Sequence, residues 1–227
     1  MRRLQRMPWT TAALVVVAGS SLASVGTKPE PIADVASVPK SCERWLQVPA
    51  NTTDETLAWD QRLSLAACRQ VFTVDTTSDP AKFRDVIAQI DRGMAPSVAM
   101  YRDVVARGDT PEVRILGAYN LGMAYLNTVV RARTAIHVID GSSGSYGGAA
   151  YGATLDRYQI LSRALEPLLI TYRLNAVTAF DDVNRMAQEN PEAATANSVM
   201  TYVVADAKRQ RVLLHPEEID TTTRATW

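Results

Sequence analysis

The sequence has little histidine, little cysteine and no excess of charge of either sign. Its two histidines, His137 and His215, have no second histidine or cysteine at metal-ligand spacing, so no zinc motif is recognisable. The sequence also lacks a Gly-Lys-Ser/Thr phosphate-binding ending and a Gly-x-Ser-x-Gly hydrolase elbow. We therefore expect no metal, no cofactor and no catalytic residue, and we do not expect an enzyme.

Long apolar runs are also missing. The longest one near the N-terminus, residues 12–18, is far shorter than the roughly 20 residues that a transmembrane helix needs. Arg2, Arg3 and Arg6 precede this run, and small residues follow it up to Ala23. This order is typical of a secretory signal peptide cleaved after Ala23. We expect a periplasmic or secreted protein without a stable membrane span, with a retained N-terminal anchor as the alternative.

The formal charge of the whole chain is zero, from 24 basic and 24 acidic side chains. Cleavage after Ala23 would remove three arginines and no acidic residue, which leaves 21 basic against 24 acidic side chains. A weakly acidic protein has no electrostatic attraction for a phosphate backbone. We therefore do not expect nucleic acid as a partner.

The two cysteines, Cys42 and Cys68, both lie in the part that would be exported. An even number of cysteines in an oxidising compartment predicts a disulfide, and their separation is too long for a redox Cys-x-x-Cys motif. Two buried free thiols are the alternative.

Proline, glycine and charge divide the chain into segments. Four prolines make residues 24–50 an extended tether, and five glycines with three serines make residues 141–152 a surface loop. We expect one helical domain over residues 51–214, a signal peptide over 1–23 and a C-terminal tail over 215–227.

Helix start signals recur between these segments. Thr52 and Glu55 have the spacing of a capping box, and a proline follows a capping residue at Asp79, Thr110 and Asn190. We also expect Gly93 to end one helix and Pro96 to begin another, and Pro167 to kink or restart a later one. Apolar residues recur at three- and four-residue steps, as in Phe83, Val86 and Ile90, without period-two alternation. The predicted fold is all-α, with antiparallel helical hairpins.

One segment carries a family resemblance. Residues 117–128 read GAYNLGMAYLNT and contain Leu121, Gly122 and Tyr125, while Ala99, Ala106 and Pro111 lie upstream. Over residues 80–128 this pattern resembles a tetratricopeptide repeat (TPR), in which small residues allow close helix packing. An ordinary amphipathic helix rich in alanine, leucine and tyrosine is the alternative.

The resemblance implies a short solenoid whose concave face binds a peptide or protein partner. The residues expected on that face are Arg84, Arg92, Tyr119, Met123 and Asn127. We therefore expect an exported, non-catalytic interaction scaffold of the cell envelope. The alternatives are an envelope hydrolase acting on peptidoglycan and a helical structural subunit that associates with its own copies.

Overall fold

All regular secondary structure in the described part of the chain is helical. The structure, a computed structural model, describes residues 40, 42, 55–136 and 149–214. No strand occurs within these residues, so the prediction of an all-α fold is confirmed. The helices are α1 (Glu55–Cys68), α2 (Phe83–Arg107), α3 (Pro111–Ala135), α4 (Ala149–Glu189), α5 (Pro191–Thr195) and α6 (Ser198–Leu213), and a short 3-10 turn, η3 (Pro80–Lys82), precedes α2.

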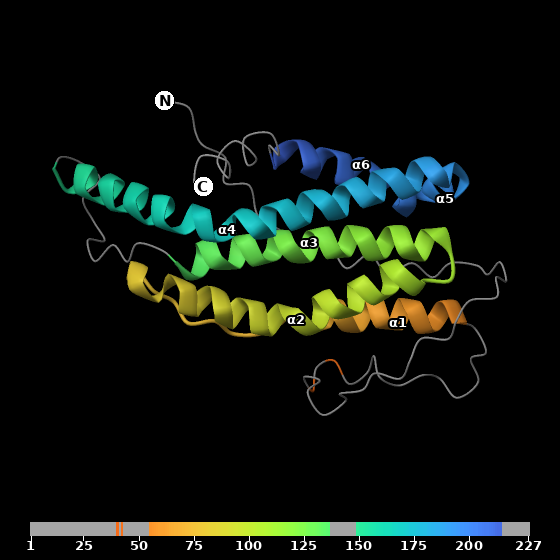
Figure 1. Ribbon diagram of the computed structural model, residues 1–227, viewed down its shortest axis with the longest axis horizontal. Coiled ribbons are helices and arrows are strands. Elements are labelled where there is room, and N and C mark those ends of the chain that lie inside the picture. Colours follow the sequence, from red (N-terminus) through yellow and green to blue (C-terminus); the bar gives the residue numbers. More distant parts are fainter. Residues whose placement is uncertain (1–39, 41, 43–54, 137–148, 215–227) are drawn as a thin grey trace.

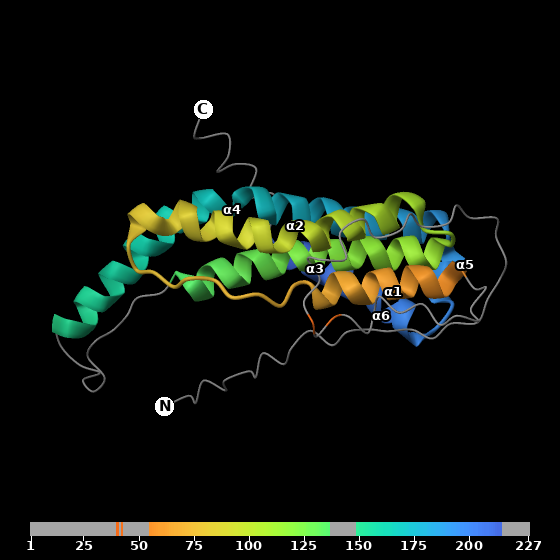
Figure 2. The same ribbon diagram turned by 90° about the horizontal axis from the view of Figure 1, so that it is seen from below.

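The long helices lie side by side in an elongated stack. Figure 1 shows α2, α3, α4 and α6 in this order across the molecule, each running opposite to the one before it. Helix α3 packs against both α2 and α4, α1 packs on α2, and α6 packs on α4. Figure 2 shows that the first part of α4 projects beyond the other helices.

Helix α3 is the central element, and it is buried on more than one side. Val113, Ile115, Ala124 and Ala132 are at most 3% exposed, although they do not share one face. A helix that packs against neighbours on several sides needs apolar residues on each of those sides. The absence of a side chain at Gly122 allows α4 to approach closely, because a Cβ there would lie 2.6 Å from the Phe180 ring.

Helix α2 corrects one prediction. Gly93 and Pro96 do not separate two helices, because α2 continues through both. Gly93 instead makes room for an aromatic ring, since a Cβ at this position would lie 2.5 Å from Phe72. Figure 1 shows α2 bending between its halves, the usual response of a helix to an internal proline. Residues 83–107 therefore do not form the helical hairpin that a TPR unit would have there.

The small residues of the expected repeat have a different role. Ala99 and Ala106 are exposed on α2, so they do not bring two helices together. The start signals upstream and downstream of α2 are nevertheless correct. Asp79 accepts a hydrogen bond from Ala81 N at 3.0 Å, and Thr110 accepts one from Val113 N at 3.3 Å.

The second half of the chain differs from the prediction at two boundaries and agrees with one of two alternatives at a third position. Helix α4 begins at Ala149, so the last four residues of the expected 141–152 loop are helical. Pro167 lies inside α4, which bends but does not restart (Figure 1), so of the two predicted outcomes the structure has the kink. The helix expected from Pro191 onward is interrupted, because Asn197 begins a new helix by accepting hydrogen bonds from Val199 N and Met200 N, both at 3.0 Å.

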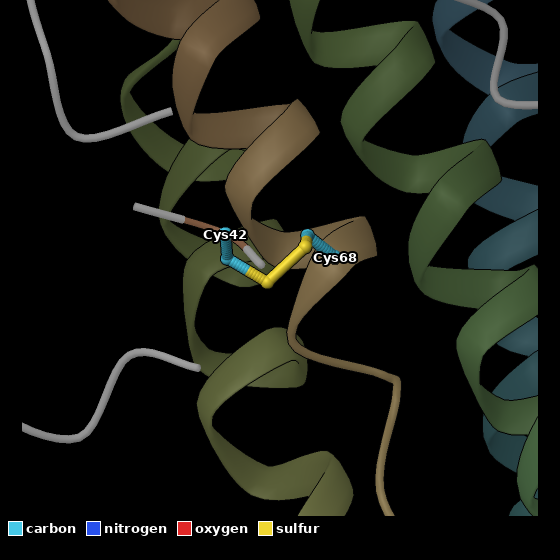
Figure 3. The surroundings of a disulfide bond; sticks show 2 residues. All are labelled: Cys42 and Cys68. Carbon is cyan, nitrogen blue, oxygen red and sulfur yellow. A yellow bond between two sulfur atoms is a disulfide. The ribbon is translucent and has the colours of Figure 1, made fainter. Parts of the chain in front are cut away.

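The predicted disulfide between Cys42 and Cys68 is confirmed. Figure 3 shows this bond joining a segment upstream of α1 to the last residue of that helix, with 5.8 Å between the two Cα atoms. Cys42 is fully buried. The bond therefore holds Cys42 against the end of α1.

Several predictions fall on residues that are not described. The signal peptide, most of the 24–50 tether, the capping residue Thr52, residues 141–148 and the C-terminal tail lie outside the described ranges. None of the helices within residues 55–136 and 149–214 has the length and apolar character required to cross a bilayer.

Candidate functional site

The five residues expected on a concave face do not share one open surface. Arg84 and Arg92 are exposed on α2, and Met123 is partly buried against the apolar cluster between α3, α4 and α6. The other two, Tyr119 and Asn127, use their polar atoms inside the protein. The expected face is thus divided between a solvent-exposed side of α2 and the covered sides of α3.

Asn127 holds the segment that follows α1. Its Nδ2 donates a hydrogen bond of 2.9 Å to Gln70 Oε1, and Gln70 Nε2 donates one of 3.1 Å to the Tyr101 hydroxyl. Arg131 donates to the carbonyl oxygens of Gln70 and Phe72, and its guanidinium lies 4.5 Å from the centre of the Phe72 ring. These contacts attach residues 70–72 across α2 and α3, so Asn127 has a structural partner.

Tyr119 belongs to a buried polar group that joins α3 to α6. Its hydroxyl donates a hydrogen bond of 2.8 Å to Asp206 Oδ2, and Gln210 Nε2 donates one of 3.3 Å to the same oxygen. Arg209 Nη2 donates to the other carboxylate oxygen of Asp206. The Asp206 side chain is 3% exposed, so these three donors replace water around its charge.

The surroundings of the Tyr119 phenol disfavour its ionised form. Burial raises the pKa of Tyr119 well above its ordinary value, and the hydrogen bond to the Asp206 carboxylate raises it further. Tyr119 therefore stays protonated at neutral pH and acts as a hydrogen-bond donor.

The outer face of α6 is an exposed apolar stripe with a cation in it. Tyr202, Val212 and Leu213 are 54%, 65% and 61% exposed, and Ala205 and Arg209 are also exposed. These positions recur at three- and four-residue steps, so they follow one side of the helix over roughly 16 Å. We call these five residues the α6 stripe.

The exposed charged side chains of α6 itself are all positive. Asp206 is the sole acidic residue in α6, and it is buried, whereas Lys208 and Arg209 are exposed. Arg211 donates a hydrogen bond of 2.6 Å to Asp181 on α4. The exposed side of α6 therefore combines apolar surface with positive charge. Sequence reasoning missed this surface, although the three- and four-residue spacing of Tyr202, Arg209 and Val212 is a signal that could have indicated it.

A separate cavity of about 170 Å³ lies where the end of α2, the start of α3 and the end of α4 meet. Its walls combine apolar and charged side chains from these three helices and the residue after α4. The lining residues are Val105, Pro111, Arg114, Arg185, Met186, Glu189 and Asn190.

Two arginines reach this cavity, and their environments differ. Arg185 donates hydrogen bonds to Asp182 at 2.9 Å and to Glu189 at 3.2 Å. Arg114 has a buried Nε without an acceptor in the part of the chain that the structure describes. The cavity thus contains one cation whose charge is matched by carboxylates and one whose buried donor is unused.

Metal chemistry receives no support from the described residues. They contain no group of three or more histidine, cysteine, aspartate or glutamate side chains that could hold a metal ion. His137 and His215 lie outside the described ranges.

No family model, no curated protein and no solved structure matches this chain.

Proposed function

We propose that this protein is an exported, non-catalytic interaction scaffold of the cell envelope. In this proposal the α6 stripe holds an acidic, apolar segment of a protein partner. The observation that supports it best is the exposure of Tyr202, Val212 and Leu213 on one side of α6 beside Arg209. Tyrosine and arginine are enriched in the centres of protein interfaces.

The chemistry of the stripe defines the partner. Exposed apolar side chains in a row gain free energy when a second apolar surface removes them from water. Because the surrounding exposed charges on α6 are positive, a segment with carboxylates beside its apolar residues matches the stripe. A second copy of α6 would bring cations against cations, which is less favourable.

Arg209 is held in place before any partner arrives. Its guanidinium is bound to the buried carboxylate of Asp206, yet its side chain is 64% exposed. A guanidinium has five N–H donors, so some of them remain for a partner carboxylate. A fixed arginine loses less conformational freedom on binding than a mobile one, which favours a directional contact with protein over mobile lipid headgroups.

The disulfide supports the location given in this proposal. A bond between Cys42 and Cys68 is stable in an oxidising compartment, where exported proteins reside. The N-terminal pattern of arginines, apolar residues and small residues points to the same export route.

Site-specific crosslinking in the native host tests the proposal. A photoreactive amino acid replaces Tyr202 in one variant and the exposed Arg84 on α2 in a control variant. We expect a crosslinked partner peptide from position 202 that contains carboxylates, and no equivalent product from position 84. Binding of that peptide should weaken at least tenfold in Arg209→Glu, and exchanging the peptide's own acid for lysine should restore it.

Other outcomes would reject the proposal. Crosslinks from position 202 to another copy of this chain would indicate self-association, which sedimentation at several concentrations would confirm. Binding to anionic vesicles without a protein product would indicate a membrane surface. A partner peptide without carboxylates, or Arg209→Glu with unchanged affinity, would remove the charge-matching argument.

A further inference from the structure

The cavity between α2, α3 and α4 is separate from the α6 stripe in its lining residues. We propose that it is a binding site for a small apolar carboxylate, whose charged group contacts Arg114 and whose hydrocarbon part contacts Val105, Pro111 and Met186. This inference does not depend on the partner proposed for the α6 stripe.

Local structure explains why Arg114 reaches the cavity. Thr110 and Pro111 begin α3, which places Arg114 in the first turns of the helix, at its electropositive end. The side-chain stem of Arg114 lies against Gly108, where an added Cβ would be 2.9 Å from Arg114 Cγ. Glycine at position 108 thus leaves the space that this stem occupies.

The charge of Arg114 at the cavity wall, without an ion pair among the described residues, is the main argument for a ligand. A cation at a cavity wall without an opposite charge beside it favours the binding of an anion, and a buried N–H without an acceptor costs free energy. The Nε of Arg114 is buried without an acceptor among the described residues, and the side chain lines a cavity large enough for a ligand. A carboxylate oxygen is the strongest common acceptor for a guanidinium N–H.

The charges of the walls limit the ligand to a single negative charge. Arg185 is already paired with Asp182 and Glu189, which leaves Arg114 as the lining cation that has no ion pair among the described residues. Glu189 also lines the cavity and would repel a dianion such as phosphate. A monocarboxylate therefore fits the charge balance better.

Volume and apolar lining define the rest of the ligand. A cavity of about 150 Å³ in another protein accommodates benzene, so about 170 Å³ holds roughly six non-hydrogen atoms. Butanoate has this size, and its propyl group would contact the apolar wall. The same chemistry occurs at the C-terminus of a peptide that ends in a small apolar residue.

Titration of the full chain with butanoate tests the site. The signal is the side-chain Nε–Hε resonance of Arg114 in an NMR spectrum. We expect a saturable shift with a dissociation constant on the order of 1 mM, because so few atoms cannot bind tightly. Butyramide, which has the same shape without the charge, should bind at least tenfold more weakly.

Variants locate the site and control for folding. Arg114→Gln should weaken butanoate binding at least tenfold, followed through backbone resonances of residues 111–114 and 185–190. Arg114→Lys retains the charge and should weaken binding less, and the exposed-site control Arg92→Gln should bind like the unmodified protein. Circular dichroism on each variant confirms that the helices remain, and Arg114→Lys provides the comparison if Arg114→Gln does not fold.

Several results would overturn this assignment. They are the absence of a saturable shift, equal binding of butyramide, or unchanged binding in the folded Arg114→Gln variant. Tighter binding of inorganic phosphate than of butanoate would also overturn it, because that order would indicate a different anion class. A peptide with a free apolar C-terminus, compared with its amidated form, distinguishes a peptide ligand from a free small acid.

Discussion

The Tyr119 hydroxyl on α3 donates a hydrogen bond of 2.8 Å to Asp206 on α6, across 87 positions of sequence. The acceptor is a buried carboxylate, which needs donors to replace the water it has lost. This bond connects the central helix to the helix that carries the exposed stripe. Arg209 donates to the same carboxylate. The buried Asp206 side chain therefore both stabilises the contact between α3 and α6 and positions Arg209.

Removal of the Tyr119 hydroxyl should destabilise the domain. Tyr119→Phe keeps the ring, which packs 6.2 Å from the Phe180 ring, but leaves Asp206 with one donor fewer. We expect the free energy of unfolding to fall by about 2 kcal/mol, the usual size for a hydrogen bond to a buried charge. Urea unfolding measures it, and Tyr202→Phe on the exposed stripe is the matched control. A difference below about 0.5 kcal/mol between the two variants would contradict the assigned role.

The unfolding free energy should fall at alkaline pH because the buried phenol of Tyr101 resists ionisation in the folded protein. Burial raises the pKa of Tyr101 well above its ordinary value, although the hydrogen bond from Gln70 opposes this shift. A raised folded-state pKa stabilises the protein below the unfolded-state pKa of about 10 and loses that contribution as pH rises toward the folded-state pKa. At pH 11 the unfolded phenol is ionised and the folded one is not, which removes about 1.4 kcal/mol.

Tyr101→Phe tests this prediction, because phenylalanine does not ionise. The variant should lose about 1.4 kcal/mol less than the unmodified protein between pH 9 and pH 11. Chemical denaturation of both proteins at pH 9 and pH 11 gives the loss of unfolding free energy for each. Equal losses in the two proteins would show that Tyr101 ionises as easily in the folded domain as in the unfolded chain.

Local patterns in the sequence predicted the helices and part of the core. The spacing of Phe83, Val86 and Ile90 identified the buried side of α2, and all three are buried. Asp79 and Thr110 were identified as caps because capping chemistry depends on residues within three positions. These features are local, so the sequence alone contains the necessary information.

Contacts between distant segments account for the errors. Gly93 was interpreted as a helix end because its neighbours in sequence permit that, whereas its contact with Phe72 depends on tertiary packing. Likewise Asn127 was assigned to a binding face, but its partner Gln70 is 57 residues away. The unmatched Arg114 was missed for the same reason, because its cavity is formed by three helices.

Substitution of Gly122 should show how closely α3 and α4 pack. Alanine is normally favoured over glycine inside a helix by about 1 kcal/mol, so Gly122→Ala would stabilise an uncrowded helix. Here the new Cβ would lie 2.6 Å from Cε1 of Phe180, inside a packed core. We expect a net loss of about 1–3 kcal/mol in urea unfolding, as found for overpacked cores.

A smaller residue opposite should relieve this crowding. The Gly122→Ala substitution should cost less in a Phe180→Leu background than in the unmodified protein, although Phe180→Leu alone is destabilising. A double-mutant cycle of unfolding free energies measures the difference. Additive costs would mean that the two side chains do not compete for the same space.

The Cys42–Cys68 bond should contribute substantially to stability, because it closes a loop with a sequence separation of 26. In the chain-entropy model a loop of this length stabilises the folded state by about 3.5 kcal/mol, mainly by restricting the unfolded chain. Replacing both cysteines with serine should lower the unfolding free energy by about that amount, and a reductant should destabilise the unmodified protein but not the serine variant. Two reactive thiols in the denatured, unreduced protein would show that the bond is absent.

The serine variant should keep its fold, because Trp59 and other buried side chains pack α1 on α2 without the bond. We expect it to retain its helical circular dichroism while unfolding at a lower urea concentration.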